Sequence, residues 1–157
     1  MLYFNSNSIK GKLDDIKVYV AVYDPNIICI SETKICETFA DNELLGDGYT
    51  LYRNDRKDGG GGVLIAIKND KALQISNPIK GPGESITLTV RCGLMKFNLI
   101  TYYRPPCEYS LENLEGILEN SYHAESILIG DLNFPDIDWI TPPHEGIIKQ
   151  NASRKNL

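Results

Sequence analysis

Hydrophobic residues recur along the chain with two periods, one typical of strands and one typical of helices. Apolar residues at alternate positions, or in short unbroken runs, predict strands in seven segments. These segments are residues 2–4, 27–30, 49–53, 63–67, 86–90, 97–103 and 127–129. The runs at 27–30 and 127–129 are apolar throughout, which indicates strands that are covered on both faces.

Helical spacing appears in two further places. Apolar residues fall near every third or fourth position across residues 13–23 and 111–118, so both segments are predicted to be helices. The first helix should end before Pro25, because a residue that precedes proline avoids the helical conformation. Ser110 is the expected N-cap of the second helix. Residues 41–45 show a weaker helical pattern.

A polar turn at residues 54–58 and four glycines at 59–62 separate two of the predicted strands. A tight turn is the favoured interpretation of these glycines. Phosphate binding is disfavoured, because neither a Lys-Ser/Thr pair nor a helix start follows them. The chain reads as one mixed α/β domain over residues 1–157, with long antiparallel-looking strands and no repeat or linker.

Composition mainly excludes classes of function. The net charge of −5 argues against a protein that coats nucleic acid through bulk positive charge, although a local basic strip is still open. Four cysteines form no CxxC pair, so no zinc site is expected. We expect reduced thiols inside a cell, in the nucleus or cytoplasm, with Cys29 as a buried small hydrophobic residue. The sequence shows neither a signal peptide nor a membrane-spanning stretch, so no membrane or secreted partner is expected.

Candidate chemistry lies at the downstream ends of the predicted strands, where α/β proteins usually place their sites. The polar residues found there are Asn5, Glu32, Tyr103, Asp131 and Asn133. A carboxylate at the rim of a buried strand costs free energy unless it is paired or binds a cation. Hard oxygen ligands of this kind suit Mg²⁺ or Mn²⁺. Each residue alone also has an ordinary interpretation, as a turn residue, a solvated charge or a core aromatic.

The order of the motifs makes the pattern more specific. Asn5 opens an Asn-x-x-Ser-Ile-x-x-Lys-Leu sequence, and Glu32 lies in Ser-Glu-Thr-Lys. Tyr-Arg-Asn-Asp-Arg at 52–56 precedes the glycines, Tyr-Arg-Pro-Pro begins at Tyr103, and Gly-Asp-Leu-Asn-Phe-Pro-Asp-Ile-Asp-Trp ends at Trp139. This series resembles the endonuclease/exonuclease/phosphatase superfamily. The glycines, the double proline and the Asp-Trp ending resemble its non-LTR retrotransposon branch in particular.

The resemblance implies a fold and a set of roles. The fold would be α/β, a four-layer sandwich of two mainly antiparallel sheets flanked by helices. The reaction would be Mg²⁺- or Mn²⁺-dependent nicking of DNA that frees a 3′-hydroxyl. Glu32 would bind the metal with Asn5 beside it, Tyr103 would donate a hydrogen bond to the scissile phosphate, and Asp131 would activate water. Asn133 would hold the surrounding network, and DNA would contact a basic strip formed by Arg53, Arg56 and Arg104.

The sequence departs from this pattern after Asp131. The Ser-Asp-His motif that closes the family's site, and a late aspartate before it, are absent from the 157 residues. His123 and His144 are the only histidines, and neither follows an aspartate. We therefore expect an incomplete second sheet and an inactive chain. Two alternatives stay open: a non-catalytic remnant with weak nucleic-acid binding, and a related phosphoesterase acting on phospholipids or inositol phosphates.

Overall fold

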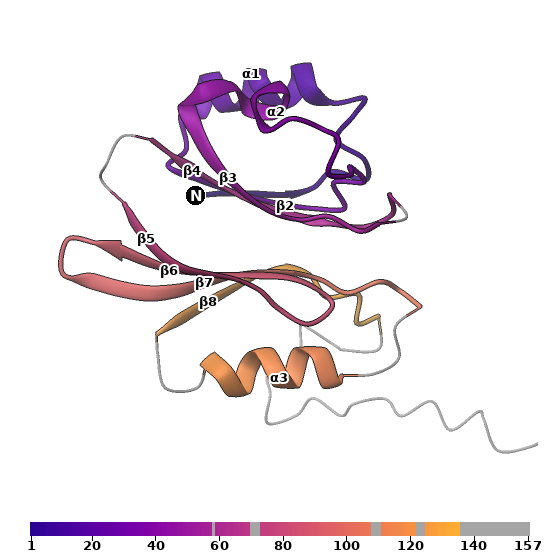
Figure 1. Ribbon diagram of the computed structural model, residues 1–157, viewed down its shortest axis with the longest axis vertical. Helices are drawn as coiled ribbons and strands as arrows, with labels where there is room; N and C mark the ends of the chain where they lie inside the picture. The colour runs from indigo at the N-terminus through magenta and orange to yellow at the C-terminus, as the bar shows by residue number, and fades with distance from the viewer. Residues whose placement is uncertain (58, 70–72, 108–110, 122–124, 136–157) are drawn as a thin grey trace, which may run out of the picture.

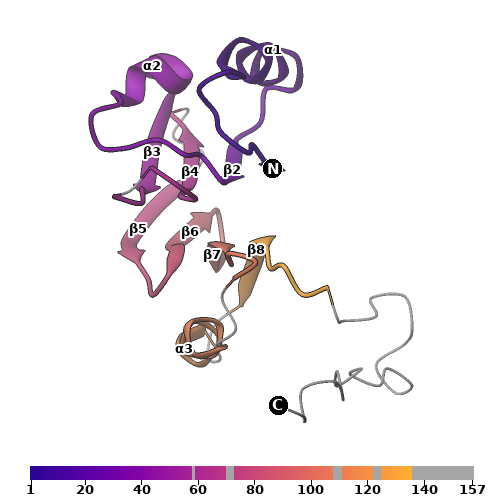
Figure 2. The same ribbon diagram turned by 90° about the vertical axis from the view of Figure 1, so that its right-hand side faces the viewer.

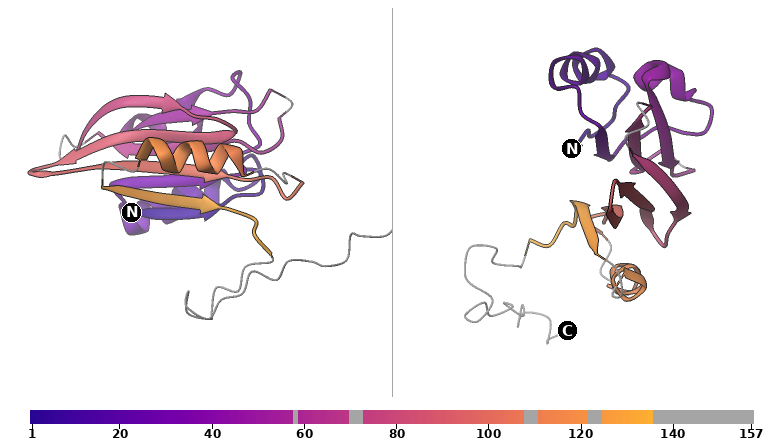
Figure 3. Two further views of the ribbon diagram at one scale, coloured as in Figure 1. Left: turned by 90° about the horizontal axis from the view of Figure 1, so that it is seen from below. Right: turned by 90° about the vertical axis from the view of Figure 1, so that its left-hand side faces the viewer.

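The computed structural model describes residues 1–57, 59–69, 73–107, 111–121 and 125–135. They form two stacked β-sheets with helices on the two outer faces, which is the predicted four-layer α/β sandwich (Figure 1). Figures 2 and 3 show the same layers from the side and from below. No described helix is long and apolar enough to cross a membrane.

The first sheet has the order β1-β2-β4-β3. Its strands are β1 (Leu2–Asn5), β2 (Ile27–Ser31), β3 (Tyr49–Asn54) and β4 (Val63–Lys68). β1 pairs with β2 in parallel, and the other pairs are antiparallel. All five residues of β2 are buried, as the apolar run predicts, because the second sheet covers one face and helices cover the other.

The second sheet also has four described strands, in the order β5-β6-β7-β8. Its strands are β5 (Gln74–Lys80), β6 (Glu84–Cys92), β7 (Met95–Tyr103) and β8 (Ser126–Asp131). Here β7 and β8 form the parallel pair, while the other pairs are antiparallel. Each sheet therefore carries one parallel pair at an edge of its described strands.

Three α-helices and one short 3-10 helix complete the described elements: α1 (Leu13–Tyr23), α2 (Asp41–Leu45), η1 (Gly46–Gly48) and α3 (Glu112–Ser121). α1 and α2 pack on the outer face of the first sheet, and α3 packs on the outer face of the second (Figure 1). α1 ends where Asp24 adopts a left-handed conformation just before Pro25. The predicted cap Ser110 lies outside the described residues.

The main core lies between the sheets, where alternate residues of both meet. Cys29 and Ile65 from the first sheet pack there with Leu88 and Leu99 from the second, all four fully buried. Burying a side chain of this size stabilises the fold by roughly 1.5–3 kcal/mol. The sandwich therefore gives the strand ends a rigid support.

Three expectations from the sequence differ from the structure. β5 was not predicted, because Pro78 and the positive-φ Asn77 break its alternation, and such residues are tolerated at a sheet edge. β8 is half-exposed at the edge of the described strands and is not a buried strand, with Ile127 40% exposed. Tyr23, the last residue in the helical apolar spacing of 13–23, is exposed and stacks on Tyr19.

Candidate active site

The polar residues singled out in the sequence lie at the ends of the two parallel strand pairs. Asn5 is the last residue of β1, and Glu32 directly follows β2. In the second sheet Tyr103 and Asp131 are register partners at the ends of β7 and β8. Because the strands of a parallel pair end on the same side, each sheet places two polar residues at the ends of its parallel strands. The strand ends of the two sheets face each other there, and this end of the sandwich is called the edge below.

One amide joins the two sheets at this edge. Asn5 Nδ2 donates hydrogen bonds to Glu32 Oε1 at 2.8 Å and to Asp131 Oδ2 at 2.8 Å. Its Oδ1 accepts the backbone N–H of Asn7 at 2.9 Å, which fixes the orientation of the amide. The predicted convergence of Asn5, Glu32 and Asp131 is confirmed. However, the nitrogen of Asn5 faces the carboxylates, so Asn5 bridges them as a donor, and its role as a metal ligand stays a prediction.

The Glu32 carboxylate is held in its charged form. Partial burial alone would raise the pKa of Glu32, but hydrogen bonds from Asn5, Lys34 and Tyr103 together with the Lys34 charge lower it below its usual range. Lys34 Nζ lies 3.1 Å from Glu32 Oε2. The opposite holds for Tyr103, whose pKa is raised to about 12 by burial and by the carboxylates of Glu32, Glu84 and Asp131. Tyr103 is therefore a protonated hydrogen-bond donor at neutral pH.

Asp131 is fixed by the turn that follows it. The backbone N–H of Asn133 donates to Asp131 Oδ1 at 3.2 Å, and Asn133 itself has a φ of +45°. The Asn133 side chain donates to the Arg104 carbonyl at 2.7 Å, and Arg104 Nη1 returns a bond of 2.7 Å to the Asn133 carbonyl. Arg104 also lies over the Phe134 ring, 4.4 Å from its centroid. Asn133 thus holds the turn, and its role in a phosphate-binding network stays a prediction.

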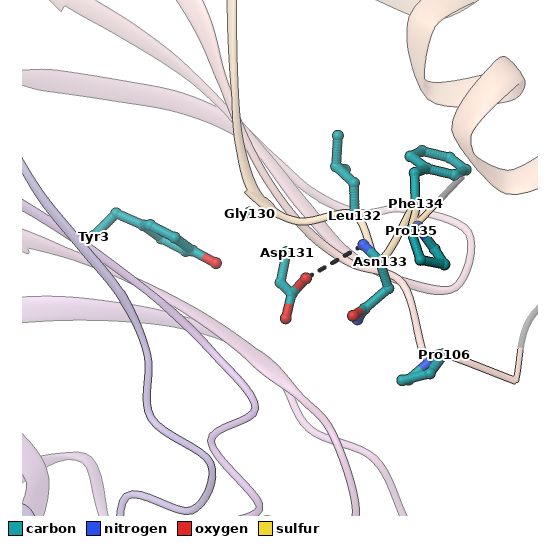
Figure 4. Close-up of a pocket in the computed structure, with 8 residues that line it drawn as sticks. All are labelled: Tyr3, Pro106, Gly130, Asp131, Leu132, Asn133, Phe134 and Pro135. Carbon is teal, nitrogen blue, oxygen red and sulfur yellow. Dashed lines mark hydrogen bonds between the residues drawn. The ribbon is translucent and has the colours of Figure 1, made fainter. Parts of the chain in front are cut away.

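A pocket of about 860 Å³ opens beside Asp131. Figure 4 shows the Tyr3 hydroxyl pointing toward Asp131, while Leu132 points away from the Asp131 carboxylate. Its remaining walls come from the turn and from Pro106 of the double-proline motif. The pocket is open to solvent and adjoins the carboxylate cluster, so a substrate group could reach it.

The three arginines predicted to contact DNA differ in their exposure and in their partners. The Arg53 guanidinium is bound by the carboxylates of Asp41 and Asp55 and by the carbonyls of Cys36 and Phe39. Arg104 is only 7% exposed. Arg56 is the accessible one, with a side chain 45% exposed and 3.3 Å from Glu84. Arg53 and Arg104 have internal structural contacts, so contact with DNA stays a prediction for all three.

Backbone strain gathers around the cluster. Among the described residues, seven that are not glycine have a positive φ, and five of them lie in segments that carry the site. These five are Asn7, Ser8, Glu32, Lys34 and Asn133. Such conformations cost about 1 kcal/mol or more each and persist where surrounding contacts enforce them. Their concentration here indicates that the segments are held in one required geometry.

The donor set fits a hard divalent cation better than a soft one. Glu32 and Asp131 supply carboxylate oxygens that share one hydrogen-bond donor, and Mg²⁺ is commonly held by one or two carboxylates with water and phosphate completing its shell. Among the described residues no group of three or more His, Cys, Asp or Glu side chains forms a metal site. The four cysteines carry free thiols, and burial raises the pKa of Cys29 to about 11. No zinc-type set of sulfur ligands is therefore present in this part of the chain.

Two contributors were not predicted from the sequence. Lys34 was recognised as part of the Ser-Glu-Thr-Lys motif but not as the ion-pair partner of Glu32. Glu84, at the start of β6, lies in none of the motifs, yet it is buried opposite Tyr103 in the sheet register. The only sequence signal for Glu84 is a charge that directly precedes an alternating strand after Gly-Pro-Gly.

Solved structures show which fold this is. The chain aligns with an AP endonuclease from Archaeoglobus fulgidus at a TM-score of 0.65 and 22% identity, covering 87% of this chain and 59% of that one. It has the endonuclease/exonuclease/phosphatase fold. The endonuclease domain of TRAS1, a telomere-specific non-LTR retrotransposon, aligns at a TM-score of 0.65 and 18% identity, covering 84% of this chain and 59% of the domain.

A third structure with this fold is a 3′ phosphatase, NExo, from Neisseria bound to product DNA hairpin, with a TM-score of 0.63 and 18% identity. It is covered over 58% of its length, against 87% of this chain. The chain thus spans less than two thirds of the length of these three proteins. No protein-family model matches the sequence, and no curated protein matches it.

Proposed function

We propose that the edge carrying Asn5, Glu32 and Asp131 belongs to a divalent-metal-dependent phosphodiesterase that nicks DNA, of the kind found in non-LTR retrotransposons. The observation that carries this proposal is the amide of Asn5, which holds carboxylates from two different sheets at 2.8 Å each. The fold shared with nucleases and a DNA phosphatase supports it, as do the ordered motifs from Asn5 to Trp139. We propose Mg²⁺ or Mn²⁺ as the cofactor and the nucleus or cytoplasm as the place of action.

Each residue has a task in this proposal. Glu32 and Asp131 would hold the ion, which when bound would neutralise charge developing on the phosphate. The Asp131 carboxylate, anchored by the Asn133 N–H, would orient the attacking water and accept its proton. Tyr103, protonated because its pKa is about 12, would donate a hydrogen bond to a phosphate oxygen. Arg56, the most exposed of the three arginines, would contact the DNA backbone.

A second candidate applies to the 157-residue polypeptide by itself. It contains no Ser-Asp-His motif, so the acid/base partner on the opposite side of the phosphate is not supplied by these residues. We propose that this polypeptide binds metal and nucleic acid weakly and cleaves DNA slowly or not at all.

Metal binding and cleavage test the proposal together. The purified chain should bind one Mn²⁺ in a calorimetric titration, and Glu32→Ala or Asp131→Ala should abolish that binding. Any nicking of supercoiled plasmid at high protein concentration should require Mg²⁺ or Mn²⁺ and disappear in both variants. Absence of Mn²⁺ binding, or metal-dependent nicking that persists in both variants, would overturn the proposal.

A further inference from the structure

Glu84 is a buried carboxylate that links the two sheets beside the proposed active site. It begins β6 of the second sheet and is only 9% exposed. Its Oε2 accepts the backbone N–H of Gly62, which belongs to the glycine turn between β3 and β4 of the first sheet. Its Oε1 lies 3.3 Å from Nη1 of Arg56, on the same turn. The carboxylate therefore clamps the turn of one sheet onto the first residue of a strand in the other.

The glycine turn also holds the segment that carries Glu32. The carbonyl of Gly61 accepts the N–H of Lys34 at 2.7 Å, and the carbonyl of Gly62 accepts the N–H of Thr33 at 3.2 Å. Glu32 and Lys34 on either side of Thr33 have φ values of +52° and +51°. Residues other than glycine adopt this conformation only when their surroundings impose it. The glycine turn supplies part of that constraint.

The loop after β1 supplies the other part. The Glu32 carbonyl accepts Ser8 N–H at 2.8 Å and Ser6 Oγ–H at 2.8 Å, and Ile9 N–H donates to the Thr33 carbonyl at 3.0 Å. The Glu32 segment thus lies between two backbone surfaces. The glycine turn is tied to the second sheet through the Glu84 carboxylate, and the loop after β1 is tied to it through the hydrogen bond from Asn5 to Asp131.

The Glu84 carboxylate occupies space that is open only because one residue of the turn has no side chain. A Cβ at Gly61 would overlap the Glu84 carboxylate, whereas a Cβ at Gly59 would meet open space. Both glycines have positive φ, +55° and +73°. The difference between them is therefore room for Glu84 and not backbone conformation.

We infer that Glu84 is a positioning residue, which acts through the glycine turn to fix the Glu32 carboxylate in the geometry that binds the metal ion. This inference rests on the proposed function. It adds a residue that touches neither metal nor substrate, and it explains why a carboxylate is buried between the sheets at this edge. Glu84 also faces Tyr103 across the β6–β7 ladder, so it contacts the same edge from the second sheet.

The test compares Mn²⁺ affinity by calorimetry with amide hydrogen exchange of the metal-free protein. Glu84→Ala should weaken Mn²⁺ binding by about 10- to 100-fold, the usual cost of removing a group that orients a metal ligand. It should also speed exchange at Thr33 and Lys34. Glu84→Gln keeps an oxygen that can accept the Gly62 N–H and should restore most of the affinity. Asp24→Ala, which removes a carboxylate paired with Lys68 at the other end of the sheet, is the matched control and should bind like the unmodified chain.

A second pair of variants covers the case in which Glu84→Ala does not fold. Gly61→Ala should displace Glu84 and weaken Mn²⁺ binding, while Gly59→Ala, also at a positive φ but facing open space, should not. Folded Glu84→Ala or Gly61→Ala protein with unchanged affinity and unchanged exchange would overturn the inference. If the unmodified chain binds no Mn²⁺, the proposed function fails, and exchange at Thr33 and Lys34 alone decides whether Glu84 positions this segment.

Discussion

At one end of the first sheet, Asn5 and Glu32 reach across to Asp131 of the second sheet through an amide that bridges two carboxylates. At the other end of the same sheet, Asp24 and Lys68 form an ion pair of 2.6 Å, with the Asp24 side chain 70% exposed. The first arrangement joins two sheets and lies among strained backbone segments. The second joins the residue that caps α1 to the last residue of β4 and is open to water.

The two ends differ in how their polar groups are held in place. Ion pairs that are exposed to water contribute little to stability, so the ion pair of Asp24 should add little to the stability of the fold. Groups that bridge two sheets must be placed to within a fraction of an ångström, and their supporting contacts become part of the site. The buried Glu84, the strained Glu32 and the crowded Gly61 are all found at the bridged end.

The largest effect is expected for DNA cleavage, which would show whether the bridged end is catalytically active by itself. The 157-residue chain should nick supercoiled plasmid slowly or not at all with Mg²⁺. Loss of an acid/base partner typically costs on the order of 10²–10⁴ in rate, and no Ser-Asp-His motif is present in these residues. The endonuclease domain of TRAS1 is the reference enzyme. Robust nicking that Glu32→Ala and Asp131→Ala abolish would show that the chain is catalytically sufficient.

The next effect concerns the stability of the core between the sheets, which supports both ends. Ile65→Ala removes a fully buried side chain from the core between the sheets and should lower the free energy of unfolding by about 2–5 kcal/mol. Leu94→Ala, at a fully exposed position, should leave it nearly unchanged. Chemical denaturation measures both. A small loss in Ile65→Ala would mean that this core does not support the strand ends as described.

A pair of amide deletions compares the two ends directly. Asn5→Ala and Asn69→Ala each remove an exposed amide with partners on other segments, so each should cost about 1 kcal/mol of stability. Only Asn5→Ala should raise the pKa of Glu32, because the Asn5 N–H groups favour the charged carboxylate. Carbon-detected NMR of the carboxyl groups measures that pKa. An unchanged value in Asn5→Ala would show that the Asn5 amide does not stabilise the charged Glu32 carboxylate.

The direction of the Glu32 pKa also fixes a pH dependence. Since the pKa is lower in the folded chain than in the unfolded one, Glu32 contributes stability above the ordinary glutamate pKa of about 4.3. That contribution is lost as the pH falls through the lowered value. In Asn5→Ala the contribution should be smaller and its loss should be complete at a higher pH, and thermal unfolding across the acidic range would show it.

The smallest effect is expected at the open end. Asp24→Ala should lower the free energy of unfolding by less than about 1 kcal/mol, because its ion pair with Lys68 is largely exposed. Raising the salt concentration should shrink the difference further. A loss as large as that of Ile65→Ala would mean that the two ends are not organised differently.

Most of the scaffold could be predicted because its strands are amphipathic or wholly apolar. Ile27 to Ile30 and the alternation at Val63 follow from local pattern, and so do the helices at Leu13 and Leu114. β5 could not be predicted, since Asn77 and Pro78 disturb its period and only pairing with β6 makes it a strand. Local sequence reports which face of an element is apolar, but not which edge a neighbouring strand will cover.

The site was predictable to the extent that its residues sit in motifs. Asn5, Glu32 and Asp131 each lie at a strand end within a recognisable short sequence, and the structure brings them together. Glu84 lies in no such motif, and its importance comes from a contact with Gly62 that spans two sheets. Arg53 lies in a motif too, but the motif does not indicate that its guanidinium binds Asp41, Asp55 and backbone carbonyls.

Paramagnetic line broadening by Mn²⁺ tests most directly the claim that one end of the sandwich is a metal site. In the amide NMR spectrum of the isotope-labelled chain, low Mn²⁺ concentrations should broaden the signals of Asn5, Glu32, Tyr103 and Asp131 before any others. The signals of Asp24 and Lys68 should stay sharp, and Glu32→Gln should remove the effect. Broadening that begins at Asp24, or that is unchanged in Glu32→Gln, would contradict the account.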